Sequence, residues 1–274
     1  MKTITLNNGN LIPQIGLGTF RSQDNAAYEA VKHALKVGYR HIDTAAIYGN
    51  EAEVGRAIKD SGIAREEVFI TSKVWNEDQG YMATRRALKR SLEKLDLEYL
   101  DLYLIHWPKT YASSAETYKA LEDLYEEGLI RAIGVSNFSF HHLEHLFATA
   151  NIMPQVNQVE CHLYLQNEKL LNFCRMHGIH LEAYAPLMSS HVKELLQDEV
   201  LQKLARKYHK TAAQIALRFL IEREFIILPK SVTPARIEEN AAIFDFELSD
   251  EDIHTLRKRN RGRRYFPDPD NIGF

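Results

Sequence analysis

Leu100-Asp101-Leu102-Tyr103-Leu104-Ile105-His106 is a short apolar run that ends in a histidine and precedes Trp107-Pro108. Apolar runs of this length are typical of strands that are buried on both faces of a parallel sheet. An amphipathic stretch follows at Ala115–Glu127, and the same strand-and-helix unit recurs along the chain. The repetition predicts an α/β fold with parallel strands.

Eight apolar runs occur, with helical patterns between them. The expected strands are Ile15–Gly18, His41–Asp43, Val68–Lys73, Leu100–His106, Ile130–Ser136, Gln155–Glu160, His180–Tyr184 and Ile226–Pro229. The expected helices are Ala26–Val37, Glu51–Ser61, Met82–Leu95, Ala115–Glu127, Phe140–Ala150, Glu168–His177, Glu199–Tyr208 and Ala212–Arg223. Eight alternations without a Pro/Gly/Ser-rich linker favour one closed (β/α)8 TIM barrel; an open doubly wound sheet is the alternative.

The two ends of the chain depart from this repeat. Asn8-Gly9, between two short β-like runs, predicts a hairpin within residues 1–13. A last helix is expected at Ser249–Arg257, followed by an irregular tail over residues 258–274, which holds Pro267 and Pro269. We assign residues 1–274 to a single domain.

Composition narrows the class of protein. The 274 residues are 45% hydrophobic and carry a net charge of −3, so nothing favours nucleic acid as a partner. Two cysteines, Cys161 and Cys174, suggest a reducing compartment. No apolar run approaches the roughly 20 residues needed to span a bilayer, and the N-terminus lacks a signal-peptide core. We expect a cytoplasmic protein with no membrane partner.

Four chemically active residues, Asp43, Tyr48, Lys73 and His106, follow or end three neighbouring strands. In a parallel barrel the carboxyl ends of the strands meet at one edge, so these side chains should converge. A phenol is a weak acid, but a nearby ammonium lowers its pKa, and a carboxylate can hold that ammonium in place. We therefore expect a site that donates a proton from Tyr48 to a carbonyl, which His106 orients. Each residue alone is more often structural, and only their joint placement indicates catalysis.

Several motifs in order give the chain a family resemblance. They are Gly38-Tyr39-Arg40-His41-Ile42-Asp43-Thr44-Ala45, Ile70-Thr71-Ser72-Lys73-Val74-Trp75, Leu102-Tyr103-Leu104-Ile105-His106-Trp107-Pro108, Ile133-Gly134-Val135-Ser136-Asn137-Phe138, Val156-Asn157-Gln158-Val159-Glu160-Cys161-His162 and Leu228-Pro229-Lys230-Ser231. From about Leu6 to Phe246 the chain resembles the aldo-keto reductases, most closely the short bacterial glyoxal/methylglyoxal and 2,5-diketo-gluconate reductases. The resemblance implies a barrel closed at its base by the hairpin, NADPH as cofactor and the four residues above as the catalytic set. We expect a monomer that acts on a small-molecule carbonyl.

The cofactor residues are expected mainly at the last strand. Gly16-Leu17-Gly18-Thr19-Phe20-Arg21 lacks the third glycine of a Rossmann fingerprint, whereas Lys230, Ser231 and a helix beginning at Pro234 make a phosphate site. The resemblance assigns the 2′-phosphate to Lys230, Ser231 and Arg236, and the adenine to Glu239 and Asn240. Ser136, Asn137 and Gln158 can hydrogen-bond the nicotinamide carboxamide, and Tyr184 can stack on its ring. Further cofactor contacts are expected at Thr19 and Leu187. Ser136-Asn137 alone could equally be a strand-ending turn. Leu163 and Ala185 replace the usual proline and serine of the family.

Three other features have ordinary explanations. His141, His142 and His145 share one predicted helix without acidic or cysteine ligands at metal spacing, so we expect no metal site. Cys161 is expected to be a packed thiol. The basic run from Arg257 to Arg264 is expected to be solvated beside the acidic segment Glu247–Asp252.

The expected substrate range follows from the side chains and loops around the site. Phe20, Trp75 and Trp107 are expected to form aromatic walls around Tyr48 and His106. The short segment Lys109–Ser113 and the short tail suggest an open mouth. We expect broad reduction of small aldehydes and dicarbonyls such as methylglyoxal. Two alternatives stay open: a dedicated keto-sugar-acid (2,5-diketo-gluconate) reductase whose tail arginines bind the carboxylate, and a non-catalytic NADPH-binding barrel.

Overall fold

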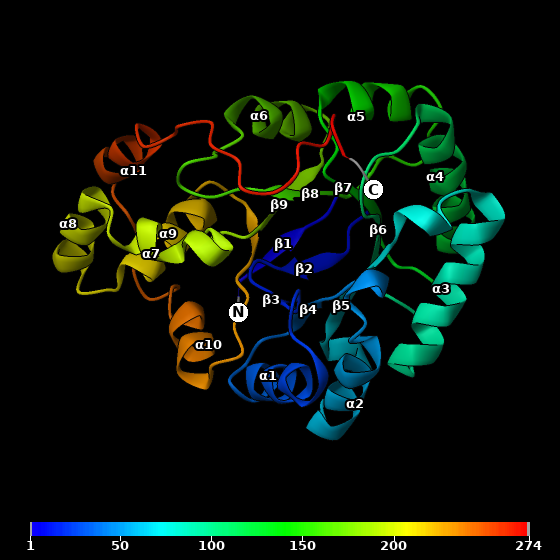
Figure 1. The fold of residues 1–274 in the computed structure, drawn as a ribbon, viewed down its shortest axis with the longest axis horizontal. Coiled ribbons are helices and arrows are strands. Elements are labelled where there is room, and N and C mark those ends of the chain that lie inside the picture. The colour runs from blue at the N-terminus through cyan, green and yellow to red at the C-terminus, as the bar shows by residue number, and fades with distance from the viewer. Residues whose placement is uncertain (1, 273–274) are drawn as a thin grey trace.

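The computed structural model describes residues 2–272, in which eight parallel strands form a barrel surrounded by helices (Figure 1). The strands are β3 (Leu17–Gly18), β4 (His41–Asp43), β5 (Phe69–Val74), β6 (Leu102–Ile105), β7 (Ile133–Ser136), β8 (Val156–Glu160), β9 (His180–Tyr184) and β10 (Ile226–Leu228). They pair in the order β10-β9-β8-β7-β6-β5-β4-β3. The amide of Gly16 donates to the carbonyl of Ile227 at 2.9 Å, and that of Gly18 to Pro229 at 3.2 Å. These bonds join the first strand to the last, which confirms the barrel and excludes the open sheet.

The helices form an outer layer. They are α1 (Asp24–Lys36), α2 (Glu51–Ser61), α3 (Tyr81–Leu95), α4 (Tyr111–Glu126), α5 (Phe140–Phe147), α6 (Glu168–Met176), α7 (Val192–Leu196), α8 (Glu199–Tyr208), α9 (Ala212–Glu222), α10 (Pro234–Ala241) and α11 (Asp250–Arg257). Tyr103 and Ile105 of β6 pack in the core that includes helix residues, whereas Leu102 and Leu104 pack inside the barrel. Burial on both faces explains why this strand reads as a continuous apolar run.

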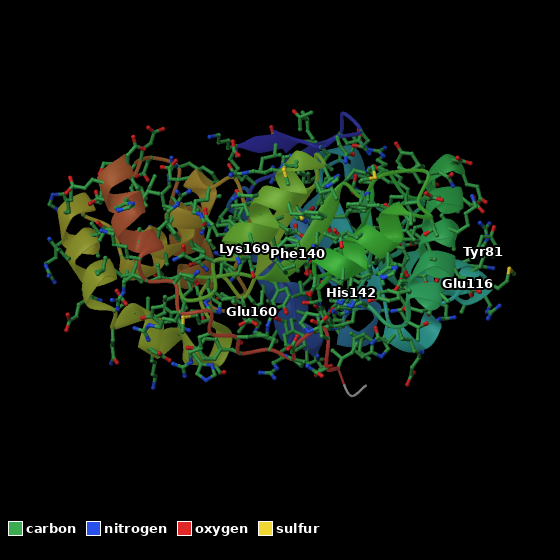
Figure 2. The ribbon with its side chains drawn as sticks, turned by 90° about the horizontal axis from the view of Figure 1, so that it is seen from above. Tyr81, Glu116, Phe140, His142, Glu160 and Lys169 are labelled. Atoms are coloured by element: carbon green, nitrogen blue, oxygen red, sulfur yellow. The ribbon has the colours of Figure 1, made fainter. Side chains whose placement is uncertain are left out.

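The N-terminal hairpin closes one end of the barrel. Strands β1 (Thr3–Thr5) and β2 (Leu11–Pro13) pair antiparallel. Leu6 and Ile12 cluster with Phe69 and Ile226, which begin β5 and β10. These residues mark the amino ends of the strands, so the expected closure at the base is confirmed. Figure 2 shows the hairpin at one end of the barrel and the C-terminal tail at the other.

Two local features differ from expectation. Helix α4 begins at Tyr111 instead of Ala115, because the Thr110 hydroxyl caps it by accepting the amide of Ser113 at 3.1 Å. The loop after β9 contains the short helix α7, which had no clear periodicity in the sequence. That loop also holds Ala185, Met188 and Ser189 at positive φ, between 49° and 63°. Such strained backbone at the carboxyl edge of a barrel is typical of ligand-binding loops.

The tail is irregular, as expected, but its partners are not the expected ones. Arg259 donates to Asp198 at 2.6 Å and Arg263 to Glu194 at 2.8 Å. The amide of Tyr265 donates to Glu160, which is labelled in Figure 2, at 2.8 Å. The prediction that the arginines lie beside Glu247–Asp252 was therefore wrong. The basic side chains instead tie the tail across the carboxyl ends of the strands.

None of the helices within residues 2–272 combines the length and apolar character that a bilayer crossing requires.

Candidate active site

Asp43 and Lys73 meet inside the barrel, near the carboxyl ends of its strands. Lys73 lies in β5 and is fully buried, and its Nζ donates to both carboxylate oxygens of Asp43 at 2.7 and 2.8 Å. A third bond, of 2.8 Å, goes to the carbonyl of Thr44. An ammonium has three protons, so all of them are used. The carboxylate and the carbonyl fix the position of Lys73 relative to the mouth.

Tyr48 and His106 complete the predicted group of four. Tyr48 ends a single 3₁₀ turn, Ala46–Tyr48, directly after β4, and Gly49 follows it with φ of 69°. Lys73 Nζ lies 5.1 Å from the centre of the Tyr48 ring. The ring centres of Tyr48 and His106 are 5.6 Å apart. The four residues therefore converge at the carboxyl edge of three neighbouring strands.

The protonation of the site differs in one respect from expectation. Burial, together with Asp43 and, when it is ionised, Glu182, raises the pKa of Tyr48 well above its ordinary value. We had expected Lys73 to lower it, but the Lys73 charge is largely offset by Asp43. Burial and the Lys73 ammonium lower the pKa of His106 well below its ordinary value. At neutral pH the site therefore presents a protonated phenol and a neutral imidazole.

Aromatic side chains surround the two groups. The ring centre of Phe20 lies 5.1 Å from that of Tyr48, and the ring centre of Trp75 lies 5.1 Å from that of His106. Trp107 is buried next to His106 in the chain, and its carbonyl accepts a bond from Gln79 at 2.7 Å. The C-terminal tail adds a further aromatic side chain to this group, which the sequence did not predict.

Phe266, in the tail, packs against two residues at the mouth. Its ring centre lies 5.2 Å from that of Tyr184 and 6.4 Å from that of Phe20. The expectation of an open mouth is therefore corrected, because the tail covers part of it.

The residues expected near a nicotinamide lie at the ends of β7, β8 and β9. The Asn137 amide nitrogen donates to the carbonyl of His106 at 3.0 Å and to Ser136 Oγ at 3.1 Å, and its oxygen accepts from Tyr184 at 2.8 Å. Asn137 has φ of 64°. Gln158 is different, because its amide nitrogen points into the barrel and donates to Asp43 at 2.8 Å. Only its oxygen remains for a carboxamide.

Thr19 and Leu187 have packing roles in the structure. The Thr19 hydroxyl and amide both donate to the carbonyl of Asp43 at 3.0 Å. Leu187 is half-buried against the apolar core.

The expected phosphate residues gather before and on α10. Ser231 Oγ accepts the amide of Thr233 at 3.1 Å, just before the helix. Lys230 and Arg236 are both exposed and make no ion pair with a carboxylate in the described part of the chain. Burial and the nearby Arg21 guanidinium lower the pKa of Lys230. Arg21, which we had not predicted, therefore adds a third cation to an anion-attracting surface.

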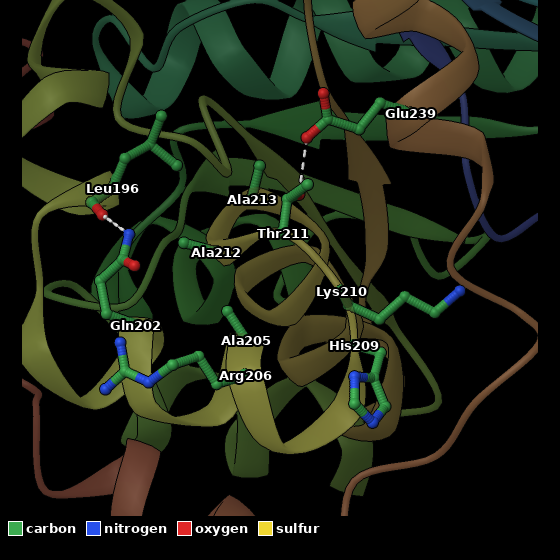
Figure 3. A pocket seen from close by; sticks show the side chains of 10 residues that line it. All are labelled: Leu196, Gln202, Ala205, Arg206, His209, Lys210, Thr211, Ala212, Ala213 and Glu239. Atoms are coloured by element: carbon green, nitrogen blue, oxygen red, sulfur yellow. Dashed lines mark hydrogen bonds between the residues drawn. The ribbon is translucent and has the colours of Figure 1, made fainter.

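A cavity of about 540 Å³ opens beside Glu239 of α10 (Figure 3). Its lining comes from α7, α8, the turn between α8 and α9, α9 and α10: Leu196, Gln202, Ala205, Arg206, His209, Lys210, Thr211, Ala212, Ala213 and Glu239. Glu239 accepts a bond from the Thr211 hydroxyl at 2.6 Å. Asn240 is buried beside it in the chain.

The sequence reading missed a buried acid inside the barrel. Glu182 of β9 is fully buried and accepts a bond of 2.6 Å from the same Gln158 nitrogen that contacts Asp43. Strand alternation could have revealed it, because Tyr184 and Glu182 are two residues apart and share a face. Phe266, by contrast, lies in a segment without periodicity that carries no such signal.

The histidine-rich helix does have an acidic neighbour. The sequence shows no acidic ligand at metal spacing, but the tail brings Asp270 to the helix, and ligand atoms of His141, His142 and Asp270 lie within 4.8 Å of one another. However, His142 Nδ1 accepts the amide of Ser139 at 3.1 Å, so a neutral ring carries its proton on Nε2. That nitrogen faces Asp270 at 3.7 Å. The arrangement favours a contact between tail and helix over a metal ligand set.

Comparisons with known proteins agree with this architecture. Residues 14–261 match the pattern of the aldo/keto reductase family. The chain is 53% identical to glyoxal reductase of Bacillus subtilis (strain 168), covering 99% of this chain and 98% of that one. It is 42% identical to methylglyoxal reductase DkgA of Escherichia coli (strain K12), covering 98% of each.

Solved structures give the same result. An aldo-keto reductase from a Medee basin deep-sea metagenome library superposes with a TM-score of 0.98 at 56% identity, covering 99% of this chain and 100% of that one. A mutant of Gox0644 in complex with NADPH superposes with a TM-score of 0.94 at 38% identity, covering 100% and 99%. The chain therefore belongs to the aldo/keto reductase family and is an oxidoreductase.

Proposed function

We propose that the protein reduces small aldehydes and dicarbonyls, methylglyoxal among them, to alcohols with NADPH, and that Tyr48 donates the proton. The observation that carries the proposal is the convergence of a protonated phenol, a buried ammonium–carboxylate pair and a neutral imidazole at an aromatic mouth. The likeness to glyoxal and methylglyoxal reductases supports the substrate class.

The residues present fit NADPH. Lys230 and Arg236, with Arg21 nearby, are cations without carboxylate partners in the described residues, which suits the 2′-phosphate. The cavity beside Glu239 has room for an adenine, and Ser136, Asn137 and the Gln158 oxygen can hold the carboxamide. When bound, NADPH supplies the hydride that the carbonyl carbon receives. Its use here is supported by the NADPH complex of a structural neighbour.

The proton follows a short route in this proposal. Tyr48 and His106 hydrogen-bond the carbonyl oxygen and orient it. As negative charge develops on that oxygen, its affinity for a proton rises, and the Tyr48 hydroxyl gives up its proton. The Lys73 ammonium stabilises the resulting phenolate, and Asp43 keeps Lys73 in position. The raised pKa of Tyr48 ensures that the phenol still carries its proton before the reaction.

The structure offers little support for the sugar-acid alternative. That alternative needs a tail arginine available for the substrate carboxylate. Arg259 lies 2.6 Å from Asp198, and Arg263 lies 2.8 Å from Glu194. Arg261 and Arg264 face Glu194 and Glu160 at 3.5 and 3.6 Å. The arginines that follow α11 are thus already matched with acids.

NADPH oxidation with methylglyoxal, an aromatic aldehyde and a diketo-gluconate tests the proposal. We expect comparable turnover of the two aldehydes with modest discrimination, since apolar walls contribute only about 1–3 kcal/mol per methylene. A preference above about a thousandfold for the sugar acid would contradict the broad range. Tight NADPH binding without oxidation by any of the three would favour the non-catalytic barrel.

A further inference from the structure

Glu182 lies inside the barrel, close enough to Tyr48 to affect its pKa, and is linked to Asp43 through Gln158. It occupies the middle of β9, where it is opposite Gln158 of β8 and Ile226 of β10. The Gln158 amide nitrogen donates to Glu182 Oε2 at 2.6 Å and to Asp43 Oδ2 at 2.8 Å. One amide group therefore bridges two buried carboxyl groups, only one of which has an ammonium partner.

The unequal bonding decides which carboxyl group holds a proton. Asp43 receives two bonds from Lys73 and one from Gln158, an environment that suits a carboxylate. Glu182 receives one bond, and its Oε1 has no hydrogen-bond partner among the described residues. The remaining ionisable neighbours of Glu182 are Tyr48 and His41 of β4. From β10, the neighbour of Glu182 is the apolar Ile226. A second carboxylate here would lack a counter-ion.

His41 does not supply that counter-ion. Its Nε2 lies 3.0 Å from the Thr71 hydroxyl but 3.8 Å from Glu182 Oε1. A Cβ at Gly16 would meet His41 Nδ1 at 2.7 Å, so the backbone holds the ring closely in place. Burial and the Lys73 ammonium lower the pKa of His41 to about 3, which leaves it neutral. Burial and Asp43 correspondingly raise the pKa of Glu182 to about 8.

We propose that Glu182 is a positioning residue that must remain protonated for Tyr48 to donate its proton efficiently. This inference rests on the proposed function. Neutral Glu182 keeps the group of Asp43, Lys73 and Glu182 at zero net charge. Its ionisation adds a negative charge near Tyr48, which makes the phenol a weaker acid. Reduction should therefore slow as the pH rises through the alkaline side of neutrality.

The first measurement is the pH dependence of kcat for methylglyoxal reduction in Glu182→Gln. Glutamine keeps an oxygen for the Gln158 bond but cannot ionise. We expect wild-type kcat to fall roughly tenfold between about pH 7 and 9.5. The kcat of Glu182→Gln should lie within about threefold of the wild-type value at pH 7 and decline little at alkaline pH.

Glu122→Gln is the control: Glu122 is a buried acid on α4 that accepts hydrogen bonds from the amides of Asn151 and Ile152. It should keep the wild-type decline. The same decline in Glu182→Gln would overturn the proposal.

The second measurement needs neither cofactor nor turnover. An acid whose pKa is higher in the folded than in the unfolded state makes the protein less stable as pH rises between those two pKa values. The Tm of Glu182→Gln minus that of wild type should therefore grow from about pH 5 to pH 8 and then level off. Parallel curves would overturn the protonated state of Glu182. If neither the wild type nor any variant reduces aldehydes, the proposed function fails. The Tm measurement still decides whether Glu182 is protonated. Glu182→Met, which also cannot ionise, replaces the glutamine variant if that variant does not fold.

Discussion

Lys73 directs all three of its protons away from Tyr48, two to the oxygens of Asp43 at 2.7 and 2.8 Å and one to the carbonyl of Thr44. The ammonium acts on the phenol through space, 5.1 Å from the ring centre. Asp43 thereby fixes the position of Lys73 but also offsets its charge. In the proposed reaction, the pair serves a phenol that stays protonated until the substrate oxygen becomes basic.

Lys73→Met should abolish most carbonyl reduction and also destabilise the fold. Removing one member of a buried ion pair leaves the other charge uncompensated, which typically costs about 3–5 kcal/mol. Thermal unfolding and steady-state kinetics check the two effects. Lys59→Met is the control, since Lys59 pairs with Asp96 at 2.7 Å on the exposed surface. It should leave both Tm and kcat close to wild type. A stable, active Lys73→Met would contradict the role of the buried pair.

Arg236→Ala should weaken NADPH binding much more than NADH binding. A charge-assisted bond to a phosphate contributes on the order of 1.5–3 kcal/mol, and NADH has no 2′-phosphate to lose. We expect the NADPH Kd to rise at least about tenfold and the NADH Kd to change little. Fluorescence titration with each nucleotide measures both. Arg86→Ala, an exposed position on α3, is the control. Equal weakening of the two cofactors by Arg236→Ala would show that the 2′-phosphate lies elsewhere.

Phe266→Ala should change discrimination between substrates. Its ring packs 5.2 Å from Tyr184 and 6.4 Å from Phe20, so it can contact an aromatic aldehyde that reaches the mouth. We expect KM for an aromatic aldehyde to rise several-fold more than KM for methylglyoxal, because the smaller substrate offers less apolar surface. Phe140→Ala, on α5, should leave both values unchanged. Equal KM values in wild type and Phe266→Ala for both substrates would exclude the tail from the substrate site.

Local patterns predicted the barrel well. The limits of β4, β9, α2 and α8 agree with the sequence reading because each element carries a clear apolar period and a clear end. The convergence of Asp43, Lys73 and His106 followed from one rule, that parallel strands end at a common edge. Tyr48 followed from its place in the next turn.

The missed features depend on contacts between distant segments. The tail reaches the mouth because Glu160 and Glu194 bind it more than 60 residues away along the chain, as in the bond from Tyr265 to Glu160. No local period records such a pairing. The pKa of Tyr48 was misjudged for a similar reason: the charge of Lys73 was visible in the sequence, but the opposing effects of burial, Asp43 and Glu182 were not.

The most direct test of the account is methylglyoxal reduction by Tyr48→Phe at saturating NADPH, with NADPH affinity titrated on the same sample. Removing a positioned acid typically costs about 10²–10⁴ in rate. We expect kcat to fall by that factor while the NADPH Kd stays within a few-fold of wild type, because the phenol contacts the carbonyl and not the phosphates. A variant that reduces methylglyoxal at close to the wild-type rate would show that Tyr48 is not the proton donor.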